Sequence, residues 1–132
     1  LHVLIPLARQ LTHDHARTLG ELIARVIVAR HPERATIARS VRSRGGKVYV
    51  DFMQNGHGQL IVAPFSVRAE PAASVSMPIR WSEINGRLNN DNYHITNAQR
   101  RMSRLDEDPL AGVLTDVPDL HSALTKLAAL SD

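Results

Sequence analysis

Two apolar segments on either side of an Asn-Gly-His-Gly tetrapeptide constrain the fold of this chain more than any other feature of its sequence. Lys47–Met53 alternates in the manner of a β-strand, and Leu60–Arg68 is predicted to be a second strand, interrupted at Pro64. Between them, Asn55-Gly56 is a strong signal for a tight turn. The sequence therefore predicts an antiparallel β-hairpin over residues 47–68.

Asp51 is unusual for the first of these strands, because a carboxylate is a poor strand former. Since side chains alternate between faces, Val48, Val50 and Phe52 are predicted to face the core, and Asp51 to share the other face with Arg68 of the second strand. A carboxylate among cations is either a structural ion pair on a solvated face or a site for a metal ion and a polyphosphate. Spacing alone leaves both alternatives open.

The rest of the chain alternates between helical and irregular patterns. Val3–Leu7 reads as a first strand, and apolar residues three and four apart predict a helix over Asp14–Arg30, capped by Thr12 or Asp14 and stopped by Pro32. Later segments are expected to be an extended stretch over 71–81, a short helix from Ser82, a basic helix over Ala98–Leu105, a loop over 106–118 and a helix over His121–Leu130. This order predicts a single α+β domain over residues 1–132, with an antiparallel sheet packed against helices.

Composition narrows the possible functions. The 132 residues carry a net charge of +3 with a pI of about 9.9, so an anionic partner is plausible. The absence of cysteine excludes disulfides and thiolate metal sites. No apolar run reaches the length of a membrane span and no signal peptide is visible, so a cytoplasmic protein without membrane contact is expected. No phosphate-binding P-loop and no hydrolase or zinc-protease motif occurs.

Several runs together resemble a known family. In order, they read LHVLIPL, a helix, RSRGGKVYVDFMQNGHGQLIVAPFSVRAEP, MPIRWSEI and HITNAQRRMSRLDEDPLAG. Over residues 1 to about 112 they are similar to the C-terminal part of the polymerase domain of bacterial DNA ligase D, a member of the archaeo-eukaryotic primase superfamily. The resemblance implies a partial primase-polymerase fold. It also implies a bacterial DNA-repair role in non-homologous end joining, in which nucleotides are added to a primer 3′ end.

The resemblance also implies roles for four residues. Leu1-His2 looks like the end of the family's second motif, which would place His2 against the triphosphate of the incoming nucleotide. The run VYVD looks like the third motif, which would make Asp51 a catalytic carboxylate that binds Mn²⁺ or Mg²⁺. Arg44 and Arg68 match the family's triphosphate-binding arginines.

The chain departs from the family pattern in three respects. Gln54 and Glu70 stand where the family often has arginine, and both changes remove positive charge beside the expected nucleotide site. The paired aspartates of the family's first motif do not occur in the sequence given. Because one carboxylate does not hold two metal ions, this chain alone is expected to be inactive as a polymerase.

The resemblance also implies partners. In the intact domain these would be DNA ends and nucleoside triphosphates, with a ligase domain and a Ku-type end-binding protein beside them. The isolated chain is expected to self-associate through the exposed sheet at Val3–Leu7, unless it belongs to a longer chain. An alternative from a different class is a non-catalytic stand-alone domain of the same fold that binds nucleic acid.

Other candidate residues have simpler interpretations. His13 and His15 beside Asp14 suggest a metal site, but a solvated helix start is favoured because no further ligand has suitable spacing. Trp81 is predicted to pack rather than to stack on a base, and His57 to be a plain turn residue. A last group of cations either follows a nucleic-acid backbone or forms a solvated helix face: Arg100, Arg101 and Arg104.

Overall fold

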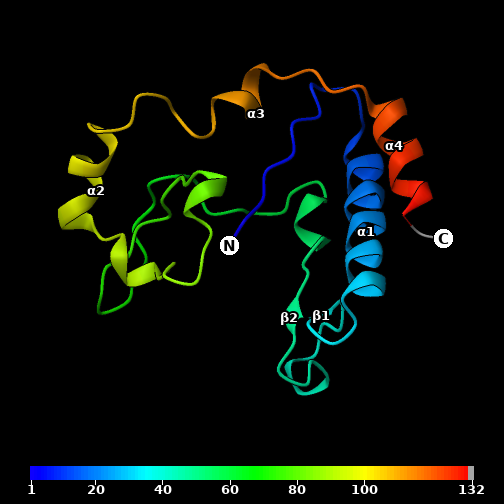
Figure 1. Cartoon of the computed structure of the whole chain (residues 1–132), viewed down its shortest axis with the longest axis horizontal. Coiled ribbons are helices and arrows are strands. Elements are labelled where there is room, and N and C mark those ends of the chain that lie inside the picture. Colours follow the sequence, from blue (N-terminus) through cyan, green and yellow to red (C-terminus); the bar gives the residue numbers. More distant parts are fainter. Residues whose placement is uncertain (131–132) are drawn as a thin grey trace. The chain divides into compact units, whose positions relative to one another are not determined.

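The computed structural model describes residues 1–130, which divide into two compact units (Figure 1). The α1 unit comprises Leu7–Leu60 and residues 117–130. The α2 unit comprises Leu1–Pro6 and Ile61–Asp116. Each unit is built from segments that are distant in sequence.

Helix α1 (His13–Arg30) is the longest element and agrees with the predicted helix. Thr12 is its N-cap, with a side-chain oxygen that accepts a hydrogen bond from the His15 amide at 3.2 Å. Helix α1 ends just before Pro32, as expected for a residue that cannot continue a helix. Ala24 and Val26 of α1 are buried, together with Ala35 of the same unit.

The sheet of the α1 unit is parallel, so the predicted antiparallel sheet is wrong. It contains β1 (Ala35–Thr36) and β2 (Val48–Tyr49), in a register that pairs Ala35 with Val48 and Thr36 with Tyr49. The Val48 amide donates to the Arg34 carbonyl at 2.8 Å, so the strand pair begins where the chain turns after α1. Val48 is 69% exposed and does not face the core as predicted.

The predicted hairpin over 47–68 fails at its turn. A tight hairpin turn at Asn-Gly requires positive φ at both central residues. Here Asn55 ends a 3₁₀ turn, η2 (Met53–Asn55), and Gly56 has a φ of −78°. Asp51 starts this turn, because its Oδ1 accepts a hydrogen bond from the Met53 amide at 2.9 Å. The carboxylate therefore lies two residues after β2, at the start of η2, instead of in the middle of a strand.

The α2 unit is mostly irregular. Two isolated antiparallel bridges, Val67 with Val75 and Ser74 with His94, organise its loops. No strand forms over residues 3–7, so the predicted N-terminal strand is also wrong. Buried residues of this unit include Ser74 and Val75, at the crossing of the two bridges.

Three further helices and three further 3₁₀ turns complete the described chain. They are α2 (Ile95–Met102), α3 (Ala111–Thr115), α4 (Leu120–Ala129), η1 (Val41–Ser43), η3 (Trp81–Glu83) and η4 (Asn90–Asn92). Helix α4 agrees with the predicted C-terminal helix, and α3 lies inside the segment predicted as a loop.

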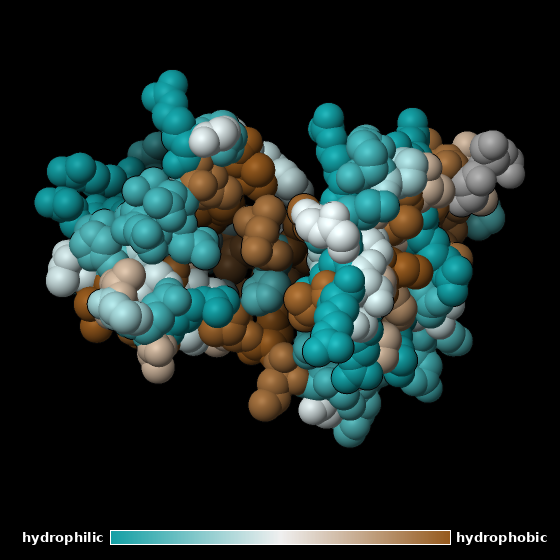
Figure 2. Space-filling model, turned by 90° about the horizontal axis from the view of Figure 1, so that it is seen from below, coloured by the Kyte–Doolittle hydropathy of each residue, from teal (hydrophilic) through white to brown (hydrophobic). Residues whose placement is uncertain are grey.

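Little apolar surface is buried in either unit. Large hydrophobic side chains lie on the surface among hydrophilic ones (Figure 2). Leu60 and Leu114 are examples, at 89% and 91% exposed. Within residues 1–130, no helix combines the length and the apolar character that crossing a membrane requires.

Candidate nucleotide and metal site

Asp51 occupies an exposed position at the end of the β2 segment. One carboxylate oxygen, Oδ1, accepts the Met53 amide hydrogen bond, which fixes the side chain over the start of η2. Within residues 1–130 Asp51 forms no ion pair, so the structural ion-pair interpretation does not hold there. The second oxygen, Oδ2, has no partner in the same described part and is open to a ligand.

Arg44 lies in the same unit as Asp51 and is held in one orientation. Its Nε donates to the Ala38 carbonyl at 3.2 Å, and its Nη2 donates to the Arg39 carbonyl at 2.9 Å. The guanidinium carbon lies 4.2 Å from the centre of the Tyr49 ring, within the range of a cation–π interaction. These contacts orient the cation while its Nη1 has no partner among residues 1–130.

The turn after Arg44 depends on two glycines. Gly45 and Gly46 have φ values of 56° and 76°, which residues with a Cβ rarely adopt. The Lys47 amide then donates to the Arg44 carbonyl at 3.0 Å, which closes the turn before β2. The sequence RGGK thus leads from the oriented arginine directly into the segment that ends at Asp51.

The other two predicted site residues, His2 and Arg68, belong to the α2 unit, and both are exposed. The Arg68 side chain makes no hydrogen bond or ion pair with residues 1–130. Glu70 accepts a hydrogen bond from the Ser74 hydroxyl and does not neutralise Arg68. The predicted nearness of His2 to Asp51 joins residues of different units and stays a prediction.

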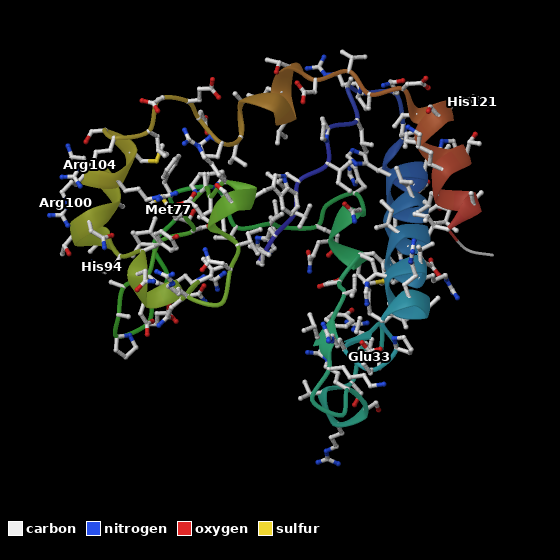
Figure 3. The ribbon with its side chains drawn as sticks, in the orientation of Figure 1. Glu33, Met77, His94, Arg100, Arg104 and His121 are labelled. Carbon is white, nitrogen blue, oxygen red and sulfur yellow. The ribbon has the colours of Figure 1, made fainter. Side chains whose placement is uncertain are left out.

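The basic cluster on α2 is smaller than the sequence predicts. Arg101 pairs with both carboxylate oxygens of Glu83, at 2.7 and 2.8 Å, and lies over the ring of Tyr93. The hydrogen bond from Arg101 lowers the pKa of the Glu83 carboxyl below its ordinary value, although partial burial opposes the shift. The same bond raises the pKa of Arg101. Of this cluster, Arg100 on α2 and Arg104 just after α2 point outward (Figure 3).

Three residues with ring side chains compare differently with the predictions. Trp81 is 74% exposed, so the prediction that it packs is wrong. Tyr49, which stacks on Arg44, was not predicted as a site residue, because nothing in the sequence marks a ring–cation contact across the turn before β2. His57 lies in a turn, as predicted, and its ring also contacts that of His13 with an edge-to-face geometry.

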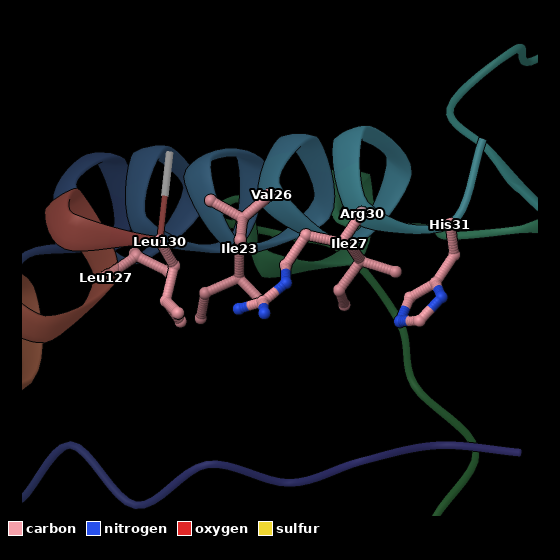
Figure 4. Close-up of a pocket in the computed structure, with 7 residues that line it drawn as sticks. All are labelled: Ile23, Val26, Ile27, Arg30, His31, Leu127 and Leu130. Carbon is pink, nitrogen blue, oxygen red and sulfur yellow. The ribbon is translucent and has the colours of Figure 1, made fainter. Parts of the chain in front are cut away.

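A groove of about 400 Å³ lies elsewhere in the α1 unit, between α1 and α4 (Figure 4). In this view His31 lies at one end of the row of lining residues, and the Arg30 side chain extends among them toward Ile23. The remaining lining of the groove is aliphatic: Ile23, Val26, Ile27, Leu127 and Leu130. Among residues 1–130, no carboxylate and no set of catalytic groups lines the groove, so its described lining differs in chemistry from the Asp51 site.

Comparison with known proteins identifies the family. The family described as "LigD, primase-polymerase domain" matches residues 1–110, which include all four predicted site residues. The chain belongs to this family. The LigD primase-polymerase match ends before α3 and α4, so the groove is formed partly by a helix outside the matched residues.

Curated LigD proteins are similar over much of this chain. The multifunctional non-homologous end joining protein LigD of Pseudomonas aeruginosa is 30% identical over 112 residues, which are 84% of this chain and 13% of that protein. The bifunctional LigD of Bacillus subtilis is 30% identical over 89 residues, 67% of this chain and 15% of that protein. The LigD of Mycolicibacterium smegmatis is 29% identical over 134 residues, 100% of this chain and 17% of that protein. The chain thus spans less than a fifth of the length of each of these relatives.

Proposed function

We propose that this chain supplies a triphosphate- and metal-binding part of a polymerase domain that adds nucleotides to a primer 3′ end in non-homologous end joining. Membership of the LigD primase-polymerase family and the names of the relatives support the process. The observation that carries the site is the exposed Asp51 carboxylate, which has one free oxygen and lies seven residues after an oriented arginine.

Asp51 suits a hard divalent cation. Mg²⁺ and Mn²⁺ prefer oxygen ligands, and Mg²⁺ keeps several water molecules when few carboxylates are available. No group of three or more His, Asp or Glu side chains able to hold a metal ion occurs within residues 1–130. Asp51 would therefore contribute one ligand, beside water and phosphate oxygens. A bound cation of this kind would neutralise charge on the triphosphate and its leaving group.

The arginines supply the complementary phosphate contacts. Arg44 loses little conformational freedom on binding, since two backbone carbonyls and Tyr49 already fix its guanidinium. Arg68 is exposed and free of partners within residues 1–130, so its charge is available to an anion. We assign triphosphate contacts to Arg44, Arg68 and His2. The proposed partners of the intact protein are DNA ends, a ligase domain and a Ku-type end-binding protein.

A nucleotide titration tests this assignment. Fluorescent nucleoside triphosphate is titrated with the 132-residue chain, with and without Mn²⁺. Arg68→Gln removes one charge-assisted contact and should weaken binding by about tenfold. Arg87→Gln is the matched control, because Arg87 is also an exposed cation of the α2 unit and was not predicted in the site. Equal losses in both variants would show non-specific attraction and refute the role of Arg68.

The Asp51→Asn variant tests the metal contact without changing the local fold. An asparagine Oδ1 can still accept the Met53 amide hydrogen bond, so η2 is retained while the charge is removed. We expect this variant to lose the part of nucleotide binding that depends on Mn²⁺ and to keep the part that does not. Binding of DNA without any binding of nucleotide would instead favour a non-catalytic nucleic-acid-binding domain.

A further inference from the structure

Arg68 begins a tight loop that ends at Ser74, within the α2 unit. The two ends of the loop meet where the Arg68 amide donates to the Ser74 carbonyl at 2.8 Å. Inside the loop, the Glu70 amide donates to the Arg68 carbonyl at 2.9 Å, and the Ala73 amide donates to the Glu70 carbonyl at 2.8 Å. Three backbone hydrogen bonds therefore set the direction in which the Arg68 side chain leaves the chain.

A side-chain hydrogen bond crosses the same loop. The Ser74 hydroxyl donates to Oε1 of the Glu70 carboxylate. Ser74 is 2% exposed and Glu70 is exposed, so the bond joins a buried hydroxyl to a carboxylate at the surface. A buried hydroxyl without a partner costs free energy, and Glu70 supplies the acceptor that Ser74 needs. The bond ties the residue two positions after Arg68 to the far end of the loop.

The far end of the loop is itself anchored. Ser74 pairs with His94 in an isolated antiparallel bridge, and the Ala73 carbonyl accepts a hydrogen bond from the Ile95 amide at 3.2 Å. Ala73 has a φ of 45°, in the left-handed region that residues with a Cβ rarely adopt. Such a backbone persists only where the surrounding contacts impose it. Loss of the Glu70–Ser74 hydrogen bond should therefore let the loop relax.

The family pattern often has arginine at the position of Glu70, so the sequence indicated only a loss of positive charge there. The hydrogen bond to Ser74 gives this carboxylate a second effect. We propose that Glu70 and Ser74 are positioning residues for Arg68, because their bond holds the loop that presents its guanidinium to the triphosphate. The proposal rests on the proposed function, since it requires that Arg68 contacts a phosphate.

Glu70 then acts on nucleotide binding in two opposite ways. Its charge repels the phosphates, and this effect is small at an exposed position and is screened by salt. Its hydrogen bond orders the backbone that carries Arg68, so less conformational freedom is lost when the nucleotide binds. One hydrogen bond of ordinary strength corresponds to about a fivefold change in affinity.

Three variants separate the two effects when fluorescent nucleoside triphosphate is titrated with the 132-residue chain and Mn²⁺. Glu70→Gln removes the charge and keeps an oxygen that accepts from Ser74, so it should bind about twofold more tightly than the wild type. Ser74→Ala removes only the hydrogen bond and should bind about fivefold more weakly than the wild type. Glu70→Ala should bind about fivefold more weakly than Glu70→Gln, and adding Ser74→Ala to it should cause no further loss.

A matched serine and a second background show that the effect is local. Ser66→Ala should bind like the wild type, because the Ser66 hydroxyl makes no hydrogen bond within residues 1–130 although the residue lies in the same unit. In an Arg68→Gln background, Ser74→Ala should no longer change nucleotide affinity. A general loss of structure would weaken binding in both backgrounds alike.

The outcomes distinguish this proposal from the one on which it rests. If the wild type binds nucleotide and Ser74→Ala binds it equally well, the positioning role is overturned and the proposed function stands. Equal affinities of Glu70→Ala and Glu70→Gln would likewise leave only the charge of Glu70 and overturn it. A wild type that binds no nucleotide would overturn both proposals. Urea denaturation of each variant detects lost folding, and the comparison at Glu70 decides if the buried Ser74→Ala does not fold.

Discussion

Gly20 controls how closely η2 approaches α1. A glycine inside a helix normally costs about 1 kcal/mol relative to alanine. At this position a Cβ would lie 2.8 Å from Nδ2 of Asn55 and 3.5 Å from the Phe52 Cβ. The first distance is too short, and the Asn55 amide is not free to move, since its Nδ2 donates to the Phe52 carbonyl at 2.8 Å. The glycine is therefore the residue that permits this packing.

Two opposing effects determine the result of Gly20→Ala. The helix gains about 1 kcal/mol from the alanine, while displacement of the Asn55 amide costs about 1 kcal/mol of hydrogen bonding. We therefore expect almost no change in the free energy of unfolding. In an Asn55→Ala background the obstructing amide is absent, and the same substitution should stabilise the chain by about 1 kcal/mol.

The measurement is a double-mutant cycle. Urea denaturation of the four proteins, followed by far-UV circular dichroism, should give a coupling of about 1 kcal/mol between the two sites. In the Asn55→Ala background, the melting temperature should rise by about 4 °C on Gly20→Ala. Equal effects of Gly20→Ala in both backgrounds would refute the argument that the asparagine amide is the limiting contact.

Three other changes test separate features. Glu83→Gln should destabilise the chain by about 1 kcal/mol at neutral pH. Because the folded pKa of Glu83 is depressed, the pair stabilises above the unfolded pKa and this contribution is lost as pH falls through the folded pKa. Urea denaturation at several pH values should show the difference from wild type vanish in acid, and a constant difference would contradict the role of the charge. Gly46→Ala should cost about 1 kcal/mol from its positive φ, since no atom lies within 4 Å of the added Cβ, and an unchanged urea midpoint would argue against that cost. The 132-residue chain alone should not extend a DNA primer with Mn²⁺, because residues 1–130 contain no three-ligand acidic cluster; extension that disappears in an Asp51→Ala control would disprove this.

Helices with a strong local pattern could be predicted from the sequence. Helix α1 combines a threonine cap, apolar periodicity and a following proline, and its predicted bounds differ by one residue from those observed. Helix α2 was predicted three residues too late at its start. It begins after His94, whose backbone amide donates a hydrogen bond to the Asn97 side chain at 3.0 Å. A histidine followed three residues later by an asparagine is not a common capping pair, so the sequence does not indicate this start.

The sheet could not be predicted, because side-chain hydrogen bonds replace the hairpin turn that the sequence favours. Asp51 and Asn55 each bond to a nearby backbone group and form η2 where a hairpin turn was expected. Strands of two residues, such as β1, are too short to show a period of two. The Asn55-Gly56 dipeptide favours a hairpin turn, but local side-chain hydrogen bonds produce a 3₁₀ turn instead. No dipeptide rule includes these bonds.

The candidate site was identified residue by residue through family resemblance, and the structure adds how two of those residues are held. The sequence alone did not show that Asp51 lies after β2 at the start of η2, or that Tyr49 and two carbonyls orient Arg44. The ring contact between His13 and His57 joins residues 44 positions apart in numbering, so no local spacing rule detects it.

The division of the chain between its units has a consequence for synthesis on the ribosome. Residues 7–60 are made first for the α1 unit, and residues 61–116 of the other unit follow before α4 emerges. The apolar groove that α1 and α4 line together therefore stays incomplete while more than fifty residues are added. Nascent chains expose such surface to chaperones and to one another. Pausing of translation within residues 61–116 would lengthen that interval and favour association of nascent chains.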